Sequence, residues 1–227
     1  MNKVIDIFHA PIKVFTSLKE KPEWVTPFVI ILIITALGAA FVISTTRGNE
    51  ELKIQQEEAM RERGLSDEQI EQAMQFTEGP LPIILGAISA PIFTAIVLVL
   101  FAVVLNLFIP LFGGKSGFKF IFPVVCFSSL VEVPQMILKS IIVAVSKSPF
   151  VTTSLALFVP TLSKSSFTYQ LLNGFDFFIL WEMILVAVGI NITNEIKKKN
   201  AYILVFIIWV VSIFLQIGLN SLGGRRG

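Results

Sequence analysis

The sequence predicts an all-α integral membrane protein with five transmembrane helices in one bundle, its N-terminus in the cytoplasm and its C-terminus outside. Two observations carry this prediction. Hydrophobic residues make up 54% of the 227 residues and charged residues only 15%, whereas soluble domains carry about 25% charge. The apolar residues are also gathered into long runs, and a bilayer core about 30 Å thick needs roughly 20 of them in a helix. The chain is therefore one membrane domain with short connectors.

Five apolar runs are long enough to cross a bilayer. Each should be helical, because backbone groups in lipid must be satisfied within their own segment. The expected spans cover about residues 25–46, 82–112, 118–145, 175–194 and 201–222. The second is over-long and should tilt, kink or protrude. A sixth apolar run, residues 149–162, is too short to span, and we expect it to be interfacial or re-entrant.

The distribution of lysine orients the bundle, because positive charge is enriched in cytoplasmic segments. The segments before the first span, after the second and after the fourth carry Lys3, Lys13, Lys19, Lys21, Lys115, Lys119, Lys197, Lys198 and Lys199. With five spans these segments lie on one side, which we assign to the cytoplasm. A sixth span at residues 149–162 would separate them. Residues 25–222 then form the membrane domain, and residues 223–227 an external tail.

Residues 1–24 form a leader that we expect to be an amphipathic helix on the cytoplasmic membrane surface. Apolar residues fall at helical spacing along it: Val4, Phe8, Ile12, Phe15 and Leu18. Phe8, Ile12 and Phe15 are the candidate contacts with lipid headgroups. Pro11 suits the first position of a helix, so we expect a break just before it. A tail packed on the bundle is an alternative that is compatible with this one.

Residues 47–81 form the only substantial polar segment, which we expect to be an acidic helical hairpin outside the membrane. Gly64 separates two helical stretches, and Ser66 with Gln69 matches a capping box that opens the second. Such a hairpin could dock an external partner or a cation, or it could be a solvated lid.

Polar side chains inside the spans are costly and are therefore candidates for function. In the third span Glu132, Gln135 and Lys139 fall on one stripe at about 100° per residue, together with Ser128 and Ser146. Glu132 and Lys139 lie about 10 Å apart along the axis, too far to pair directly.

Other spans add further polar candidates, namely Asn106, Asp176, Glu182, Asn191 and Asn194. All of these residues could line a proton or cation route, or they could join helices through hydrogen bonds.

No catalytic, cofactor or metal motif is present. One histidine and one cysteine exclude the usual zinc ligand sets. A net charge of +2 without a basic face gives no sign of nucleic acid binding. The run Gly113-Gly114-Lys115-Ser116 ends like a phosphate-binding loop, but Ile109 stands where that motif needs glycine. We therefore predict no enzyme and no cofactor.

Two stretches carry a resemblance to a known family. The leader reads Ile7-Phe8-His9-Ala10-Pro11-Ile12-Lys13-Val14-Phe15, then Lys21-Pro22-Glu23-Trp24, and the fourth span begins Phe175-Asp176-Phe177-Phe178-Ile179-Leu180-Trp181-Glu182. With five spans and an acidic first loop, the chain resembles the bacterial branch of the Yip family, the Ypt/Rab-interacting membrane proteins. The resemblance implies a five-helix bundle in the bacterial cytoplasmic membrane, with accessory roles beside transport systems as one possibility. The chain lacks the long cytosolic N-terminal region of the eukaryotic members, which act with Rab GTPases.

We therefore expect a non-enzymatic scaffold or accessory protein that contacts the lipid bilayer and acts through helix–helix contacts with a membrane-protein partner or with itself. One alternative is a small transporter or channel-like protein with a polar site for protons or cations. Another is a lipid-interacting protein that perturbs the bilayer through its leader and residues 149–162. A water-filled cavity reaching Glu132 would favour the transporter, and a dry bundle with an exposed apolar groove would favour the scaffold.

Overall fold

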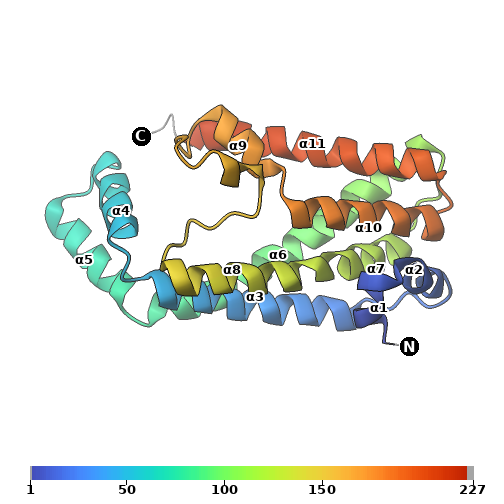
Figure 1. Cartoon of the computed structure of the whole chain (residues 1–227), viewed down its shortest axis with the longest axis horizontal. Helices are drawn as coiled ribbons and strands as arrows, with labels where there is room; N and C mark the ends of the chain where they lie inside the picture. The colour runs from blue at the N-terminus through green and yellow to red at the C-terminus, as the bar shows by residue number, and fades with distance from the viewer. Residues whose placement is uncertain (1, 224–227) are drawn as a thin grey trace.

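The computed structural model describes residues 2–223, and its regular elements in this range are all helical, so the all-helical prediction is confirmed for the described part of the chain. The α-helices are α1 Lys3–His9, α2 Pro11–Glu20, α3 Val25–Thr46, α4 Glu50–Glu62, α5 Asp67–Glu78, α6 Leu81–Phe108, α7 Phe118–Ser128, α8 Glu132–Ser146, α9 Phe167–Gly174, α10 Phe177–Thr193 and α11 Lys198–Gly223. Short 3-10 helices are η1 Ile109–Phe112, η2 Ser129–Val131 and η3 Leu155–Phe158. The long helices run along the length of the molecule, and α4 and α5 project from one end (Figure 1).

Four helical stretches are long and apolar enough to cross a membrane: Val25–Thr46, Leu81–Phe112, Phe118–Ser146 and Lys198–Ser221. They correspond to the first, second, third and fifth predicted spans. The fourth apolar helix, α10, has 17 residues and is about 26 Å long at about 1.5 Å per residue. The count of five spans and the division into leader, membrane domain and tail stay predictions. Apart from its first residue, the expected tail 223–227 lies outside the described residues.

The third predicted span is not one straight helix. Pro134 has no N–H, so the carbonyl of Leu130 loses its helical donor, and the backbone tightens into η2 at this point. A 3-10 turn advances by about 120° per residue instead of about 100°. The predicted stripe is therefore broken before Glu132. Ser128 faces the protein core, and its hydroxyl has no hydrogen-bond partner among the described residues.

The protein core is built around α7 and α10. Every residue of α7 from Ile121 to Ser128 is buried, and α10 packs against it. Gly189 permits this approach, because a β-carbon there would lie 2.3 Å from Cγ1 of Val124. Helices α3 and α6 pack against each other on one side of this core, and α11 packs on α10 on the other (Figure 1).

The leader packs on the bundle as two helices. Ala10 breaks it, and Pro11 is the first residue of α2, as predicted. Because the helix restarts there, the expected apolar face is not continuous: Phe15 is fully buried, whereas Ile12 is 65% exposed. Phe8 packs edge-on against the ring of Trp181, with centroids 5.9 Å apart. The expectation that Phe15 contacts lipid headgroups is therefore wrong, since α10 and α7 cover that part of α2.

Two connectors carry shorter structure. Helices α4 and α5 are separated by Gly64, whose φ of +79° favours glycine, and the predicted capping box at Ser66 is present. The side of the membrane on which they lie stays a prediction. Residues 149–162 have no regular structure apart from η3 and an isolated bridge between Ser154 and Asp176, and Phe158 is 79% exposed. Its expected interfacial or re-entrant position stays a prediction. Helix α9 follows it, and the pattern of the sequence does not predict this helix.

Candidate functional site

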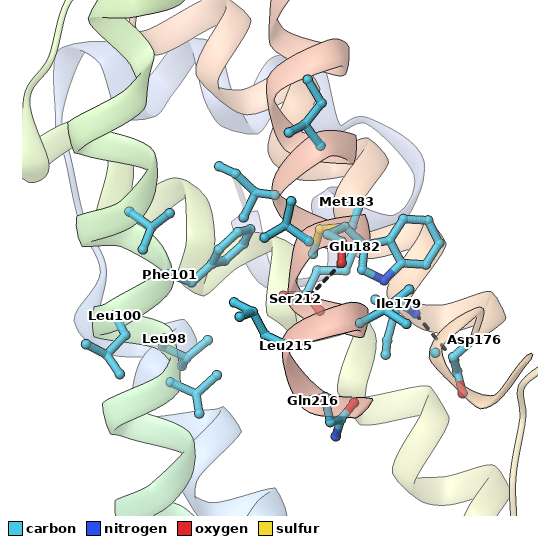
Figure 2. A pocket seen from close by; sticks show the side chains of 18 of the residues that line it. Leu98, Leu100, Phe101, Asp176, Ile179, Glu182, Met183, Ser212, Leu215 and Gln216 are labelled. Atoms are coloured by element: carbon cyan, nitrogen blue, oxygen red, sulfur yellow. Dashed lines mark hydrogen bonds between the residues drawn. The ribbon is translucent and has the colours of Figure 1, made fainter. Parts of the chain in front are cut away.

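Helices α6 and α11 face each other across an open space. Helix α6 packs on α3 and α7, and α11 packs on α10 and α9. Between α6 and α11 lies a cavity of about 1160 Å³, which we call the lateral groove. Its walls include Leu100, Phe101 and Phe108 from α6 and Ile207, Ser212 and Leu215 from α11. Figure 2 shows side chains from the two helices pointing into this space from opposite sides.

The floor of the lateral groove is polar. Glu132, Gln135 and Lys139 of α8 line it together with Asp176 and Glu182 at the start of α10. These five candidates come from two spans and meet on one surface. The polar floor and the apolar walls make the groove amphipathic.

The sequence places Asp176 inside the fourth predicted span. In the structure Asp176 lies just before α10 and caps the N-terminus of that helix. Its Oδ1 accepts hydrogen bonds from the backbone N–H of Phe178 at 2.8 Å and of Ile179 at 3.4 Å. The same carboxylate accepts from Thr153 Oγ1 at 2.5 Å and from Gln135 Nε2 at 3.1 Å. A carboxylate at this position satisfies free N–H groups and is favoured by the helix dipole. Asp176 and Gln135 are therefore committed to holding α8, α10 and the preceding loop together.

The other three charged or polar residues of the floor differ in whether they form hydrogen bonds within the chain. The carboxylate of Glu182 accepts a hydrogen bond from the hydroxyl of Ser129, which joins α10 to η2. Glu132 and Lys139 are half-buried and form no hydrogen bond or ion pair with any residue that the structure describes. The floor thus holds an acid and a base that make no direct hydrogen bond or ion pair in the described chain, although each lies in the electrostatic field of the other.

The three amide candidates lie elsewhere, at the end of the bundle where α2, η1 and the α10–α11 turn meet. We call this the closed end. The side-chain oxygen of Asn106 accepts from the backbone N–H of Gly117 at 2.9 Å, and the amide of Asn191 donates to the carbonyl of Ile196 at 2.7 Å. The amide of Asn194 donates to the carbonyl of Lys115 at 2.8 Å. All three shape turns of the chain and none lines the groove.

Charges at the closed end are paired. Glu195 forms ion pairs with Lys115 at 2.6 Å and with Lys19 of the leader at 3.4 Å. Hydrogen bonds from these two lysines, Lys115 first, lower the pKa of Glu195 below its ordinary value. The leader and the connectors after the second and fourth predicted spans therefore meet at one end.

Sequence reasoning missed two hydroxyl partners in this region. Ser129 and Thr153 bond to the carboxylates of Glu182 and Asp176. Neither had a distinguishing signal, because each contact joins segments far apart in the chain. Among the side chains that the structure describes, no group of three or more His, Cys, Asp or Glu is placed to hold a metal ion.

A bundle of long apolar helices with an amphipathic groove belongs to the class of multi-pass integral membrane proteins, which contact the lipid bilayer through those helices. The Yip1 domain family matches residues 5–219 of the chain, so this protein belongs to that family, and the predicted resemblance is confirmed. The chain is also similar to "Membrane protein YknW" of Bacillus subtilis (strain 168), with 28% identity over 226 residues that cover 96% of this chain and 91% of the relative. No solved structure matches the chain.

Proposed function

We propose that the protein is a non-enzymatic scaffold or accessory protein that receives a transmembrane helix of a partner membrane protein in the lateral groove. One observation carries the proposal: α6 and α11 line the groove from opposite sides with apolar side chains that no part of the described chain covers. Leu100 is 57% exposed, Ile207 49% and Leu215 63%. A helix seated between them would bury these side chains against protein. Close packing of this kind drives association of helices in lipid.

The length of the groove supports an elongated occupant. Its α6 wall runs from Val97 to Phe108, which is about 17 Å at about 1.5 Å per residue, and Leu111 and Phe112 of η1 extend it. A bilayer core is about 30 Å thick. A partner segment, here called the guest, that contacts the whole wall would therefore run alongside several turns of α6. A helix parallel to α6 has this shape.

The proposal includes five spans, with the N-terminus in the cytoplasm and the α4–α5 hairpin outside. The meeting of Lys19, Lys115 and Glu195 at the closed end supports it, because five spans bring the leader and these two connectors to one side. Cysteines introduced at Glu58 and at Lys198, in a Cys126→Ser background, test the orientation. An impermeant reagent should label the first in intact cells and spare the second. Labelling of both, or the reverse, would contradict this topology.

Filling the groove tests the scaffold role. Leu100→Trp with Leu215→Trp should reduce the partner protein recovered by affinity purification from native membranes several-fold, because the indole rings occupy the guest's place. Ile92→Trp is the matched control, since Ile92 is 56% exposed on α6 and does not line the groove. If the double variant and the Ile92→Trp control recover every partner protein in equal amounts, the proposal is contradicted.

A second function, passage of protons or cations, is favoured by the reach of the groove to Glu132, Lys139 and Glu182. Ionisable residues that face a cavity within a membrane protein are typical of such routes. Glu132→Leu should then fold normally but lose a flux that the unmodified protein supports in proteoliposomes. Absence of any flux from the unmodified protein, under imposed pH and cation gradients, would exclude this candidate.

A further inference from the structure

We infer that the helix received by the lateral groove carries a basic and an acidic side chain on one face, seven residues apart, which pair with Glu132 and Lys139. The inference rests on the proposed function and names the chemistry of the partner. The apolar walls of the groove contact the partner helix, and the polar floor selects a partner helix by its charged side chains.

The first step is that Glu132 and Lys139 are the uncommitted charges of the floor. Asp176 and Gln135 bond to each other at 3.1 Å, and Glu182 accepts from Ser129. Glu132 and Lys139 form no such contact with the described residues, yet both line the groove. A charge within the bilayer core is costly, and these two act on each other only from a distance, without an ion pair, so a guest that supplies a direct counter-charge to each is favoured over one that supplies neither.

The second step is the geometry of the pair. Lys139 follows Glu132 by seven residues in the same helix, α8. Seven residues rise about 10 Å and rotate by nearly two full turns, so both side chains leave the same face of α8. A partner helix lying along the groove matches them with a lysine or arginine at the level of Glu132 and an aspartate or glutamate at the level of Lys139. The two positions in the partner helix must therefore differ by seven residues.

The third step is the sign of the charge at each level. Glu182 of α10 adds a carboxyl group to the floor beside those of Glu132 and Asp176. The floor therefore holds three carboxyl groups and one ammonium group, and the guest's basic residue is the more strongly selected of its two charges. A partner with an acid alone pairs with Lys139 and leaves Glu132 without a direct counter-charge.

Site-specific photocrosslinking tests the inference. The full chain carries p-benzoylphenylalanine in place of Leu100 and is reconstituted in lipid vesicles with synthetic transmembrane peptides of leucine and alanine. One peptide carries lysine and aspartate seven residues apart, on one face. A second, of identical composition, carries them nine residues apart and therefore on opposite faces. A third has no charge. The same photoreactive residue in place of Ile92 gives the background for α6 outside the groove.

We expect the seven-residue peptide to crosslink at Leu100 at least fivefold more than either of the others, with no difference between peptides at Ile92. Glu132→Gln and Lys139→Met should each reduce this preference, and the double variant should remove it. Thermal unfolding of each variant shows whether it retains its fold.

The other outcomes separate this inference from the proposed function. All three peptides could crosslink equally at position 100 and well above the background at position 92. The groove would then bind transmembrane helices without selecting them by charge, and only the inferred charge pairing would be overturned. If no peptide exceeds the Ile92 background, the scaffold function is wrong as well. Crosslinks at Leu100 to phospholipid, or to a second copy of the chain, in place of peptide would also overturn the inference.

Discussion

The closed end and the lateral groove use polar side chains in opposite ways. At the closed end every candidate amide has a backbone partner in the described chain: Asn106 with Gly117, Asn191 with Ile196 and Asn194 with Lys115. In the groove, Glu132 and Lys139 have none. A polar residue in an apolar run is thus weak evidence for function by itself. The presence or absence of a partner within the chain separates side chains that hold the fold from side chains left for a guest.

The largest expected effect concerns packing at the closed end. Phe15→Ala should lower the free energy of unfolding by about 3–5 kcal/mol, because it leaves a cavity in a fully buried site. Ile12→Ala, on the same helix but 65% exposed, should change it by about 0.5 kcal/mol or less. Equilibrium unfolding in detergent measures both. Similar values for the two variants would mean that the leader is not held by the bundle.

The next effect tests the amide partners. Asn194→Ala removes the donor to the carbonyl of Lys115, a bond of 2.8 Å, and should lower the free energy of unfolding by about 1–3 kcal/mol. Asn220→Ala is the matched control, because Asn220 bonds to Gln170 at 3.1 Å in an exposed position. Thermal unfolding should separate the two variants. Equal melting temperatures would remove the distinction between the closed end and the solvated surface.

A smaller effect is expected in the groove. Glu132→Leu should leave the free energy of unfolding unchanged or raise it by about 1 kcal/mol, since no partner is orphaned and a poorly solvated carboxyl is removed. Asp176→Leu should lower it by about 2 kcal/mol, because the helix cap and the bonds to Thr153 and Gln135 are lost. A strong loss of stability in Glu132→Leu would show that Glu132 holds the fold, and the comparison would break down.

The smallest effect is a pH dependence at the closed end. The pKa of Glu195 is lowered from 4.5 by Lys115 and Lys19. A carboxyl with a lowered folded-state pKa contributes stability that is present above 4.5 and is lost as the pH falls through its folded value. Glu195→Gln should therefore flatten the fall in melting temperature below pH 4.5, and 1 M salt should weaken the effect because the pairs are exposed. An unchanged pH profile would show that these ion pairs contribute nothing.

Local patterns in the sequence predicted the elements well. The expected span 25–46 is α3, and α6 with η1 begins one residue before the expected span 82–112. Hydropathy and helix formation depend on neighbouring residues, which a single sequence contains. The capping box at Ser66 and the helix start at Pro11 are local for the same reason.

Contacts between distant segments explain what the sequence did not predict. Helical spacing identified an apolar face on the leader, but it could not tell whether lipid or α10 covers Phe15. The stripe in the third span assumed a straight helix, whereas η2 turns Ser129 toward Glu182. The lateral groove depends on which helices fail to pack together, and no run of residues encodes that by itself.

The burial of the leader has a consequence for biogenesis. Phe15 lies so close to α10 that a β-carbon at Gly189 would be 3.1 Å from its ring. The ribosome releases the leader first, but its packing surface is complete only after α10 has been inserted. The order of packing in this bundle therefore differs from the order of synthesis. A ribosome stalled before α10 would therefore hold a chain whose first helices are still open to protease.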